Sequence, residues 1–172
     1  MRARIFRSMG VMLVIVSLIY IVCIRFDIGP RSLHYYITRS TPLPFEEIGG
    51  IKLGTILDEA APIHGQTQIK DETDSFVYYE YDSGVEVAAL KSTKEIVRIR
   101  IEGQDNQTTG KGIALGAGLR EVKKRYGKNY YKRSEQGADI IGYIDKRKKT
   151  TLEFWLYENK VTLIRYDVKT MN

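Results

Sequence analysis

Alternation of hydrophobic and polar residues along the chain predicts β-strands. In the segment 96–102 (IVRIRIE), apolar residues alternate with Arg98 and Arg100, so one face of the strand is buried and the other meets water. Further runs rich in β-branched and aromatic residues have the length of strands, at 75–81, 85–91, 139–144, 151–157 and 161–167. Short turns separate neighbouring runs, and this indicates antiparallel hairpins.

A short amphipathic helix is predicted before each group of strands, because a similar phrase occurs twice. Residues 115–127 read LGAGLREVKKRYG, and residues 53–65 read LGTILDEAAPIHG. In the later copy, apolar residues recur with the spacing of a helix, and Gly127 is suited to end it. In the earlier copy, Pro62 should limit the helix to about two turns.

The pattern therefore predicts an α+β fold in which one short helix and a three-stranded antiparallel meander are repeated in tandem. The first unit is expected at residues 48–103 and the second at 111–168. A unit of about 55 residues is small for independent stability, so we expect the two units to pack together or to share a continuous sheet.

An apolar segment near the N-terminus predicts a transmembrane anchor ahead of these units. Residues 9–24 read MGVMLVIVSLIYIVCI and follow three arginines. The uncharged run is long enough to span a bilayer as a helix, and the arginines favour a cytoplasmic N-terminus with the rest of the chain outside. A cleaved signal peptide is the alternative, although the run lacks the small residues that suit cleavage.

The domain organisation that follows is that of a single-pass membrane protein. Residues 1–25 are expected to form a cytoplasmic stub and the transmembrane helix, and residues 26–47 a juxtamembrane stalk. Pro42 and Pro44 favour an extended conformation for this stalk. The only cysteine, Cys23, lies in the apolar run, so an intrachain disulfide is excluded.

Charge divides the chain into an acidic and a basic part, within a net charge of +6. Residues 45–110 carry six Lys or Arg against thirteen Asp or Glu, whereas residues 111–172 carry fifteen against seven. The strongest basic cluster falls at a predicted hairpin connection and in the loop before it. Its members are Lys146, Arg147, Lys148, Lys149, Lys132 and Arg133.

These six residues are the candidate binding site. Cations at a loop tip can simply keep an exposed edge soluble. The functional alternative is that they bind an anionic surface polymer, a lipid headgroup or an acidic protein. Nucleic acid is not expected as a partner, because the predicted topology places these residues outside the cytoplasm.

The sequence offers little catalytic chemistry, and we expect neither an enzyme nor a cofactor nor a bound metal. The glycines of 103–112 (GQDNQTTGKG) have the wrong spacing for a phosphate-binding loop. The alternative hypothesis is an envelope enzyme or a metal-dependent sensor that uses His64 with the acidic residues Asp71, Glu72 and Asp74.

The repeated phrase also carries a family resemblance. The resemblance covers roughly residues 48–168. It consists of a Leu-Gly pair, a short helix, Tyr-Gly or His-Gly and then an aromatic meander. This order of features resembles the small extracytoplasmic modules of the SmpA/OmlA outer-membrane assembly lipoproteins and the repeats of β-lactamase inhibitor proteins. The phrase is most similar to the domain that precedes CAP domains in Gram-positive secreted proteins. The resemblance implies a non-catalytic binding or scaffolding module outside the membrane, and no partner carries over from it. From the anchor, the repeats and the basic residues, we expect the partner to be another protein of the bacterial envelope or an anionic surface polymer.

Overall fold

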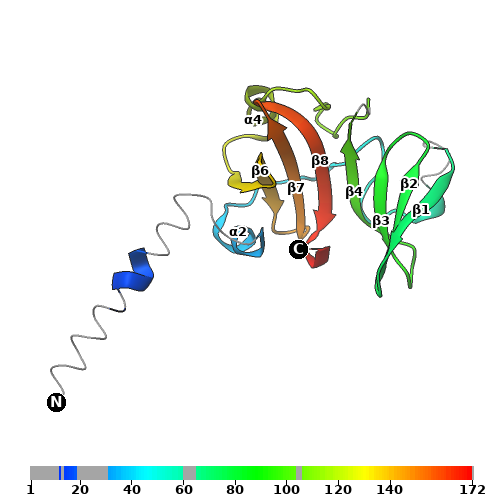
Figure 1. Ribbon diagram of the computed structural model, residues 1–172, viewed down its shortest axis with the longest axis horizontal. Coiled ribbons are helices and arrows are strands. Elements are labelled where there is room, and N and C mark those ends of the chain that lie inside the picture. Colours follow the sequence, from blue (N-terminus) through cyan, green and yellow to red (C-terminus); the bar gives the residue numbers. More distant parts are fainter. Residues whose placement is uncertain (1–11, 13, 19–30, 60–64, 104–105, 172) are drawn as a thin grey trace, which may run out of the picture.

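The computed structural model describes residues 12, 14–18, 31–59, 65–103 and 106–171. Eight antiparallel strands form one continuous sheet in the order β1-β2-β3-β4-β8-β7-β6-β5 (Figure 1). The strands are β1 (Thr67–Glu72), β2 (Phe76–Tyr81), β3 (Glu86–Leu90), β4 (Ile96–Glu102), β5 (Tyr131–Glu135), β6 (Ala138–Asp145), β7 (Thr150–Tyr157) and β8 (Lys160–Val168).

The predicted arrangement of two repeated units, each a short helix with a three-stranded meander, is wrong. The six strands expected from the hydrophobic pattern are confirmed, but β1 and β5 extend the sheet at its two edges, and β4 pairs with β8 in its centre. The edge strands escaped the prediction because TQIKDE and YKRSE are polar sequences without hydrophobic alternation. Polar edge strands are common, because they protect a sheet from pairing with other chains.

The described part of the chain contains no helix that is long and apolar enough to cross a membrane. Most of the predicted anchor at 9–24 lies outside the described residues.

Short helical elements accompany the sheet, among them α2 (Arg31–Ile37), α4 (Leu119–Tyr126) and the 3₁₀ helix η1 (Lys169–Met171). Helix α4 confirms the later predicted helix and ends at Gly127, which has a φ of 89° and whose N–H donates to the Lys123 carbonyl at 2.9 Å. In the earlier copy, residues 57–59 are helical, whereas 60–64 lie outside the described residues.

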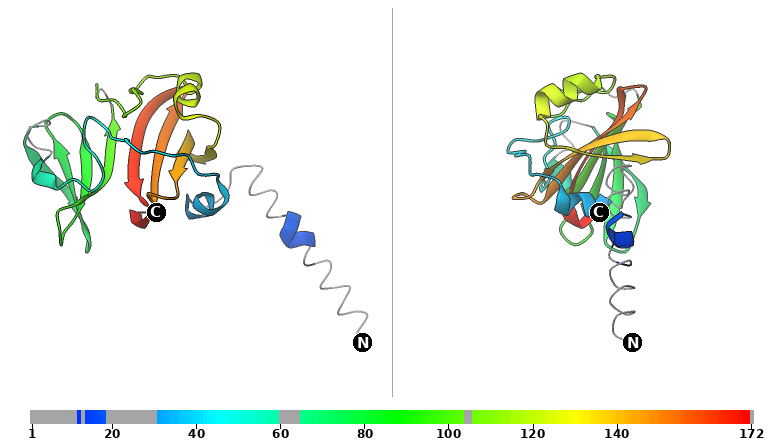
Figure 2. Two further views of the ribbon diagram at one scale, coloured as in Figure 1. Left: turned by 180° about the vertical axis from the view of Figure 1, so that it is seen from behind. Right: turned by 90° about the vertical axis from the view of Figure 1, so that its left-hand side faces the viewer.

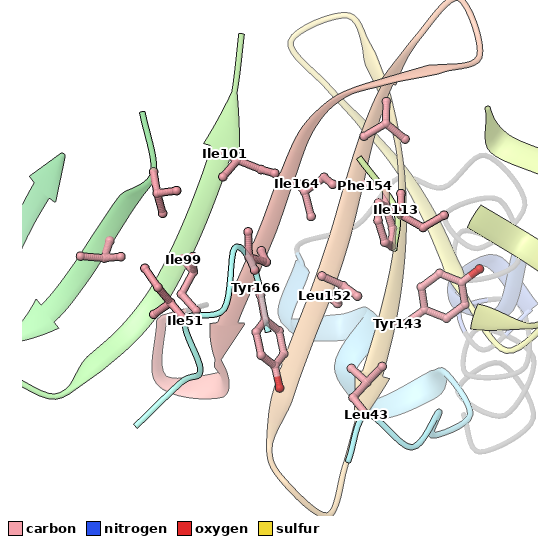
Figure 3. Packing of buried hydrophobic residues seen from close by; sticks show 14 of the residues in the cluster. Leu43, Ile51, Ile99, Ile101, Ile113, Tyr143, Leu152, Phe154, Ile164 and Tyr166 are labelled. Carbon is pink, nitrogen blue, oxygen red and sulfur yellow. The ribbon is translucent and has the colours of Figure 1, made fainter. Parts of the chain in front are cut away.

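The hydrophobic core lies on one face of the sheet. Apolar residues from β3, β4, β8, β7 and β6 point to this face and are almost fully buried. Figure 3 labels Ile99, Ile101, Ile164, Tyr166, Leu152, Phe154 and Tyr143 among them. Val87 and Ile141 belong to the same cluster. Helix α4 covers one end of the core with Val122 and Tyr126. Ile113, from the loop before α4, packs into the same cluster.

The segment predicted as an extended stalk contributes to this core. After α2, the chain crosses the sheet (Figure 2), and Leu43 is 1% exposed within the hydrophobic cluster. Its backbone N–H donates to the Asp145 carboxylate at 2.8 Å, and Thr41 N–H donates to the Ile144 carbonyl at 2.8 Å. Residues 31–43 are therefore part of the folded domain rather than a spacer.

Candidate functional site

The face of the sheet opposite the core is lined largely by charged side chains, because the polar positions of the central alternating strands point to it. We call it the charged face. It consists of Glu86 on β3, Arg98, Arg100 and Glu102 on β4, Arg165 and Asp167 on β8, Glu153 and Trp155 on β7, and Arg133 on β5.

Strand register brings opposite charges together on this face. Arg98 lies opposite Asp167 on the adjacent strand, and Arg165 lies opposite Glu153. Arg100 lies opposite Arg165, a repulsive pairing if it stood alone. Each of these two arginines has its own carboxylate partner, so the like charges are tolerated.

Glu153 is the centre of a buried ion-pair network. Its carboxylate is inaccessible to solvent and accepts hydrogen bonds from Arg31 Nε at 3.0 Å, Arg133 Nε at 3.0 Å and Arg165 Nη2 at 2.5 Å. The Tyr131 hydroxyl also donates to it. Burial by itself opposes ionisation, but the three guanidinium groups hold the pKa of Glu153 well below its usual range. Glu153 is therefore a carboxylate in the folded protein.

Asp167 is the second buried carboxylate of the network. It accepts two hydrogen bonds from Arg31, at 3.0 and 2.5 Å, and one from Arg98 Nε at 3.1 Å. Arg31 thus joins both buried carboxylates and fastens α2 to the sheet. Nη2 of the same Arg98 guanidinium group donates to the Met171 carbonyl at 3.0 Å, which fixes η1 on the same side.

Helix α2 covers one end of the charged face through aromatic packing as well. The His34 ring stacks on Tyr131 with the ring centroids 4.8 Å apart, and Tyr35 packs with Tyr131 and Ile144. Tyr131 in turn lies over Gly142, where a Cβ atom would overlap its ring. A glycine at this position on β6 therefore allows the tyrosine to reach Glu153.

Beyond α2 the charged face opens into a groove of about 610 Å³. Trp155 and Leu163 are apolar groups in its lining, and Arg98, Arg100, Arg165, Glu86, Glu102 and Glu135 are charged groups. Trp155 is half-buried, with the guanidinium of Arg133 5.5 Å and that of Arg165 5.4 Å from its ring centroid. We call this site the Trp155 groove.

The charged groups of the groove are held in place by one another. Arg100 donates to Glu86 at 3.2 Å and to Glu102 at 2.5 Å, and Glu135 pairs with Arg133. Arg100 and Glu102 retain 29% and 51% of their side-chain exposure. They can therefore exchange this ion pair for contacts with a ligand. Such an arrangement suits recognition by charge and shape, with an aromatic surface for an apolar group.

The six predicted binding residues do not form one site. Arg133 belongs to β5 and to the buried network, with only 7% exposure, whereas Lys132 next to it is exposed. Residues 146–149 form the turn between β6 and β7, at the end of the sheet that carries α2 (Figure 1). Sequence reasoning missed Trp155, Arg165 and the buried carboxylates, although their positions in the alternating pattern mark them as facing away from the core.

The turn 146–149, which we call the basic turn, is organised by the buried carboxylate of Asp145. This group accepts hydrogen bonds from the backbone N–H groups of Arg147 and Lys148, both at 3.0 Å, and from Leu43 N–H. Burial alone would raise the pKa of Asp145, but these donors together lower it. The turn is thus fixed to the chain that follows α2.

The three acidic residues of the alternative hypothesis lie in or directly after the exposed edge strand β1, with Asp74 in the bend that follows it. Asp71 and Glu72 lie on the fully exposed edge strand β1, and His64 lies outside the described residues. Among the described residues, no group of three or more His, Cys, Asp or Glu side chains could hold a metal ion.

Comparison with known proteins yields only remote structural similarity. No family model matches this chain, and no curated protein matches it significantly. An extracellular protein containing an SCP domain from Bacillus anthracis str. Ames is similar in structure, with a TM-score of 0.48 and 9% identity over 69% of this chain and 45% of that one. A DUF4309 family protein (YjgB) from Bacillus subtilis subsp. subtilis str. 168 has a TM-score of 0.46 and 16% identity over 70% of this chain and 83% of that one.

This chain thus matches less than half of the length of the B. anthracis protein. The SmpA/OmlA part of the sequence resemblance is unconfirmed. Both similarities are too remote to assign an activity.

Proposed function

We propose that this chain is a non-catalytic binding module of the bacterial envelope that acts outside the cytoplasm and holds a segment of a partner protein in the Trp155 groove. The observation that carries the proposal is the groove itself, in which an aromatic side chain lies among ion-paired arginines and glutamates on a rigid sheet.

The lining of the groove favours a polypeptide over a uniformly anionic polymer. Three arginines and three glutamates contribute to it, so the charges of the groove balance. A polymer with only negative charges would meet the glutamates as well as the arginines, and repulsion would cancel much of the attraction. A peptide that carries both signs and one apolar side chain can satisfy both kinds of charge and cover Trp155.

The location outside the cytoplasm is supported by the sequence, because an arginine-flanked apolar run at 9–24 is typical of exported chains. An epitope placed after Asn172 should be digested when protease is added to intact cells or, where there is an outer membrane, to cells with that membrane permeabilised. Protection of the epitope until the inner membrane is lysed would overturn this part of the proposal.

The groove can be tested directly, because Trp155 is the only tryptophan in the chain. Random peptides displayed on phage would be selected on the purified full chain, and synthetic copies would be titrated while Trp155 fluorescence is recorded. We expect selected peptides with mixed charge to change this fluorescence and to bind Arg100→Glu at least about tenfold more weakly, a loss of roughly 1.4 kcal/mol.

Arg100 is suited to this test because its described partners are the groove residues Glu86 and Glu102, so the buried network is left intact. Ile69→Ala is the matched control, since Ile69 is 64% exposed on the distant edge strand β1. Peptides that bind Arg100→Glu as well as the unmodified chain, or that leave Trp155 fluorescence unchanged, would refute the groove as the binding site.

A further inference from the structure

We propose that the end of the sheet formed by α2, the basic turn and the chain around Phe45 rests on an anionic lipid surface. This inference concerns a surface separate from the Trp155 groove and does not depend on peptide binding there. The inference is based on exposed apolar side chains, on the cations between them and on the position of α2, the first helix after the N-terminal apolar run.

Three large apolar side chains at this end face solvent. Phe45 is 84% exposed, Tyr36 65% and Ile37 43%. Leu43, two residues before Phe45, is buried, whereas Pro44 and Phe45 are both exposed, so the chain turns outward at Pro44 and Phe45. Exposed apolar residues that lie together have a cost in water unless another surface covers them.

The basic turn connects these residues into one surface. The Lys146 ammonium donates to the Tyr36 carbonyl at 2.9 Å, and the Lys148 ammonium donates to the Pro44 carbonyl at 2.5 Å. Tyr36 and Phe45 therefore lie on the two sides of the same turn. Lys169 adds a further cation, with its ammonium 4.7 Å from the centroid of the Tyr36 ring.

Two acidic residues adjacent to the basic turn and to Phe45 are directed into the fold. Asp145, which precedes the four cations, is 2% exposed and directs its carboxylate to backbone N–H groups inside the turn. Glu46, which follows Phe45, is 5% exposed and accepts hydrogen bonds from Tyr126 and Gly110. Asp145 and Glu46 are thus turned into the fold, and the basic turn presents its four cations to an approaching partner, while Glu95 lines the depression beside Phe45 and Lys148.

Lipid is the partner that best fits this combination. Lysines and arginines beside exposed aromatic and aliphatic groups are typical of surfaces that lie in the headgroup region, where each cation near anionic lipid contributes about 1 kcal/mol. An acidic protein would use the cations but would not require exposed apolar side chains on both sides of them.

Chain continuity supports the same assignment. Residues 25–30 alone separate the apolar run 9–24 from Arg31, the first residue of α2, and α2 forms part of the proposed surface (Figure 2). If the apolar run enters a membrane, the end of the domain that carries α2 is the part of the described fold that follows the run most closely along the chain.

The test places a fluorescent reporter on the proposed surface of the full-length chain. Trp155 is replaced by phenylalanine, and a single tryptophan is introduced either as Phe45→Trp or, as the matched control, as Ile69→Trp, which is similarly exposed but lies on β1. Each protein is added to vesicles of phosphatidylcholine with or without phosphatidylglycerol, whose acyl chains carry bromine as a quencher.

We expect bromine to quench Phe45→Trp severalfold more than Ile69→Trp in vesicles that contain phosphatidylglycerol, and the difference to shrink in neutral vesicles. Raising the salt to about 1 M, where the Debye length is about 3 Å, should also reduce it. The salt dependence is measured on the unaltered basic turn, so it does not rely on the folding of a variant.

The contribution of the cations is tested by replacing Lys146, Arg147 and Lys148 with serine and Lys149 with asparagine. Asparagine is used because Lys149 has a φ of 57°, a conformation that asparagine tolerates well. This variant should lose most of the quenching of Phe45→Trp while its thermal unfolding stays close to that of the parent.

Equal quenching at positions 45 and 69, or equal quenching in neutral and anionic vesicles, would overturn the proposal. Protection of Phe45→Trp from iodide by poly-glutamate, without quenching by brominated lipid, would instead identify an acidic polypeptide as the partner and equally refute a lipid surface. Failure of peptide binding in the Trp155 groove would leave these measurements unaffected.

Discussion

The buried network around Glu153 makes a strong prediction about stability. In Glu153→Gln, the three guanidinium groups of Arg31, Arg133 and Arg165 would face a neutral amide. Their side chains are only 11%, 8% and 18% exposed, so water cannot replace the lost carboxylate. Removal of one member of a buried ion pair costs about 3–5 kcal/mol, because the remaining charge is left without compensation.

For a chain of this size, each kcal/mol corresponds to about 2–4 °C in the unfolding midpoint, so Glu153→Gln should lower it by roughly 6–20 °C. Urea unfolding followed by far-ultraviolet circular dichroism measures the free energy directly. The matched control is Glu72→Gln, because Glu72 pairs with Lys91 on the surface with 55% exposure. The control should lose less than about 1 kcal/mol. Equal losses in the two variants would refute the assignment of Glu153 as the centre of the network.

The same network should make stability depend on pH in a defined direction. Because the pKa of Glu153 is lowered in the folded state, its contribution is fully present above its ordinary value of 4.5. The contribution is lost as the pH falls from this value towards the lowered pKa of the folded state. The difference in unfolding free energy between the parent and Glu153→Gln should therefore be constant from about pH 5.5 to 7.5 and shrink below about pH 4.5. A difference that grows as the pH falls would contradict this reasoning.

Two further substitutions test packing on the two faces of the sheet. Gly142→Ala should cost about 1–3 kcal/mol, because the new methyl group overlaps the Tyr131 ring, whereas Gly118→Ala has open space and should change stability by far less. Leu43→Ala should cost about 2–5 kcal/mol, since Leu43 is buried in the core, and Phe45→Ala two positions later should cost little because Phe45 is 84% exposed. Thermal and urea unfolding measure all four, and an inert Leu43→Ala would mean that the segment after α2 does not belong to the folded domain.

Much of the local structure was predictable from the sequence. The alternation in IVRIRIE predicts β4 with its core-facing residues, and the spacing of apolar residues before Gly127 predicts α4. Both patterns depend on neighbours along the chain, so they need no tertiary information. The edge strand β5 was not predictable in this way, because YKRSE is stabilised by pairing with β6 and by the contact of Tyr131 with Gly142.

The candidate site was predictable only in part. The charged residues of 146–149 could be recognised as a basic turn, since they are consecutive in the sequence. Arg133 was also identified, but as a free cation rather than as a partner of Glu153. Trp155 gave no signal of a groove, because the groups around it come from other strands.

For the six strands with hydrophobic alternation, the sequence by itself determined which residues face away from the core, because side chains alternate with a period of two. It could not determine which of these residues meet. Arg98 and Asp167 are 69 residues apart, and Arg31 and Glu153 are 122 apart. These pairs form because β4 joins β8 in one particular register and α2 folds back over the sheet, and both choices depend on the packing of the whole domain rather than on any local segment. Tertiary structure therefore decided that polar positions spread over the chain became one buried network and one groove.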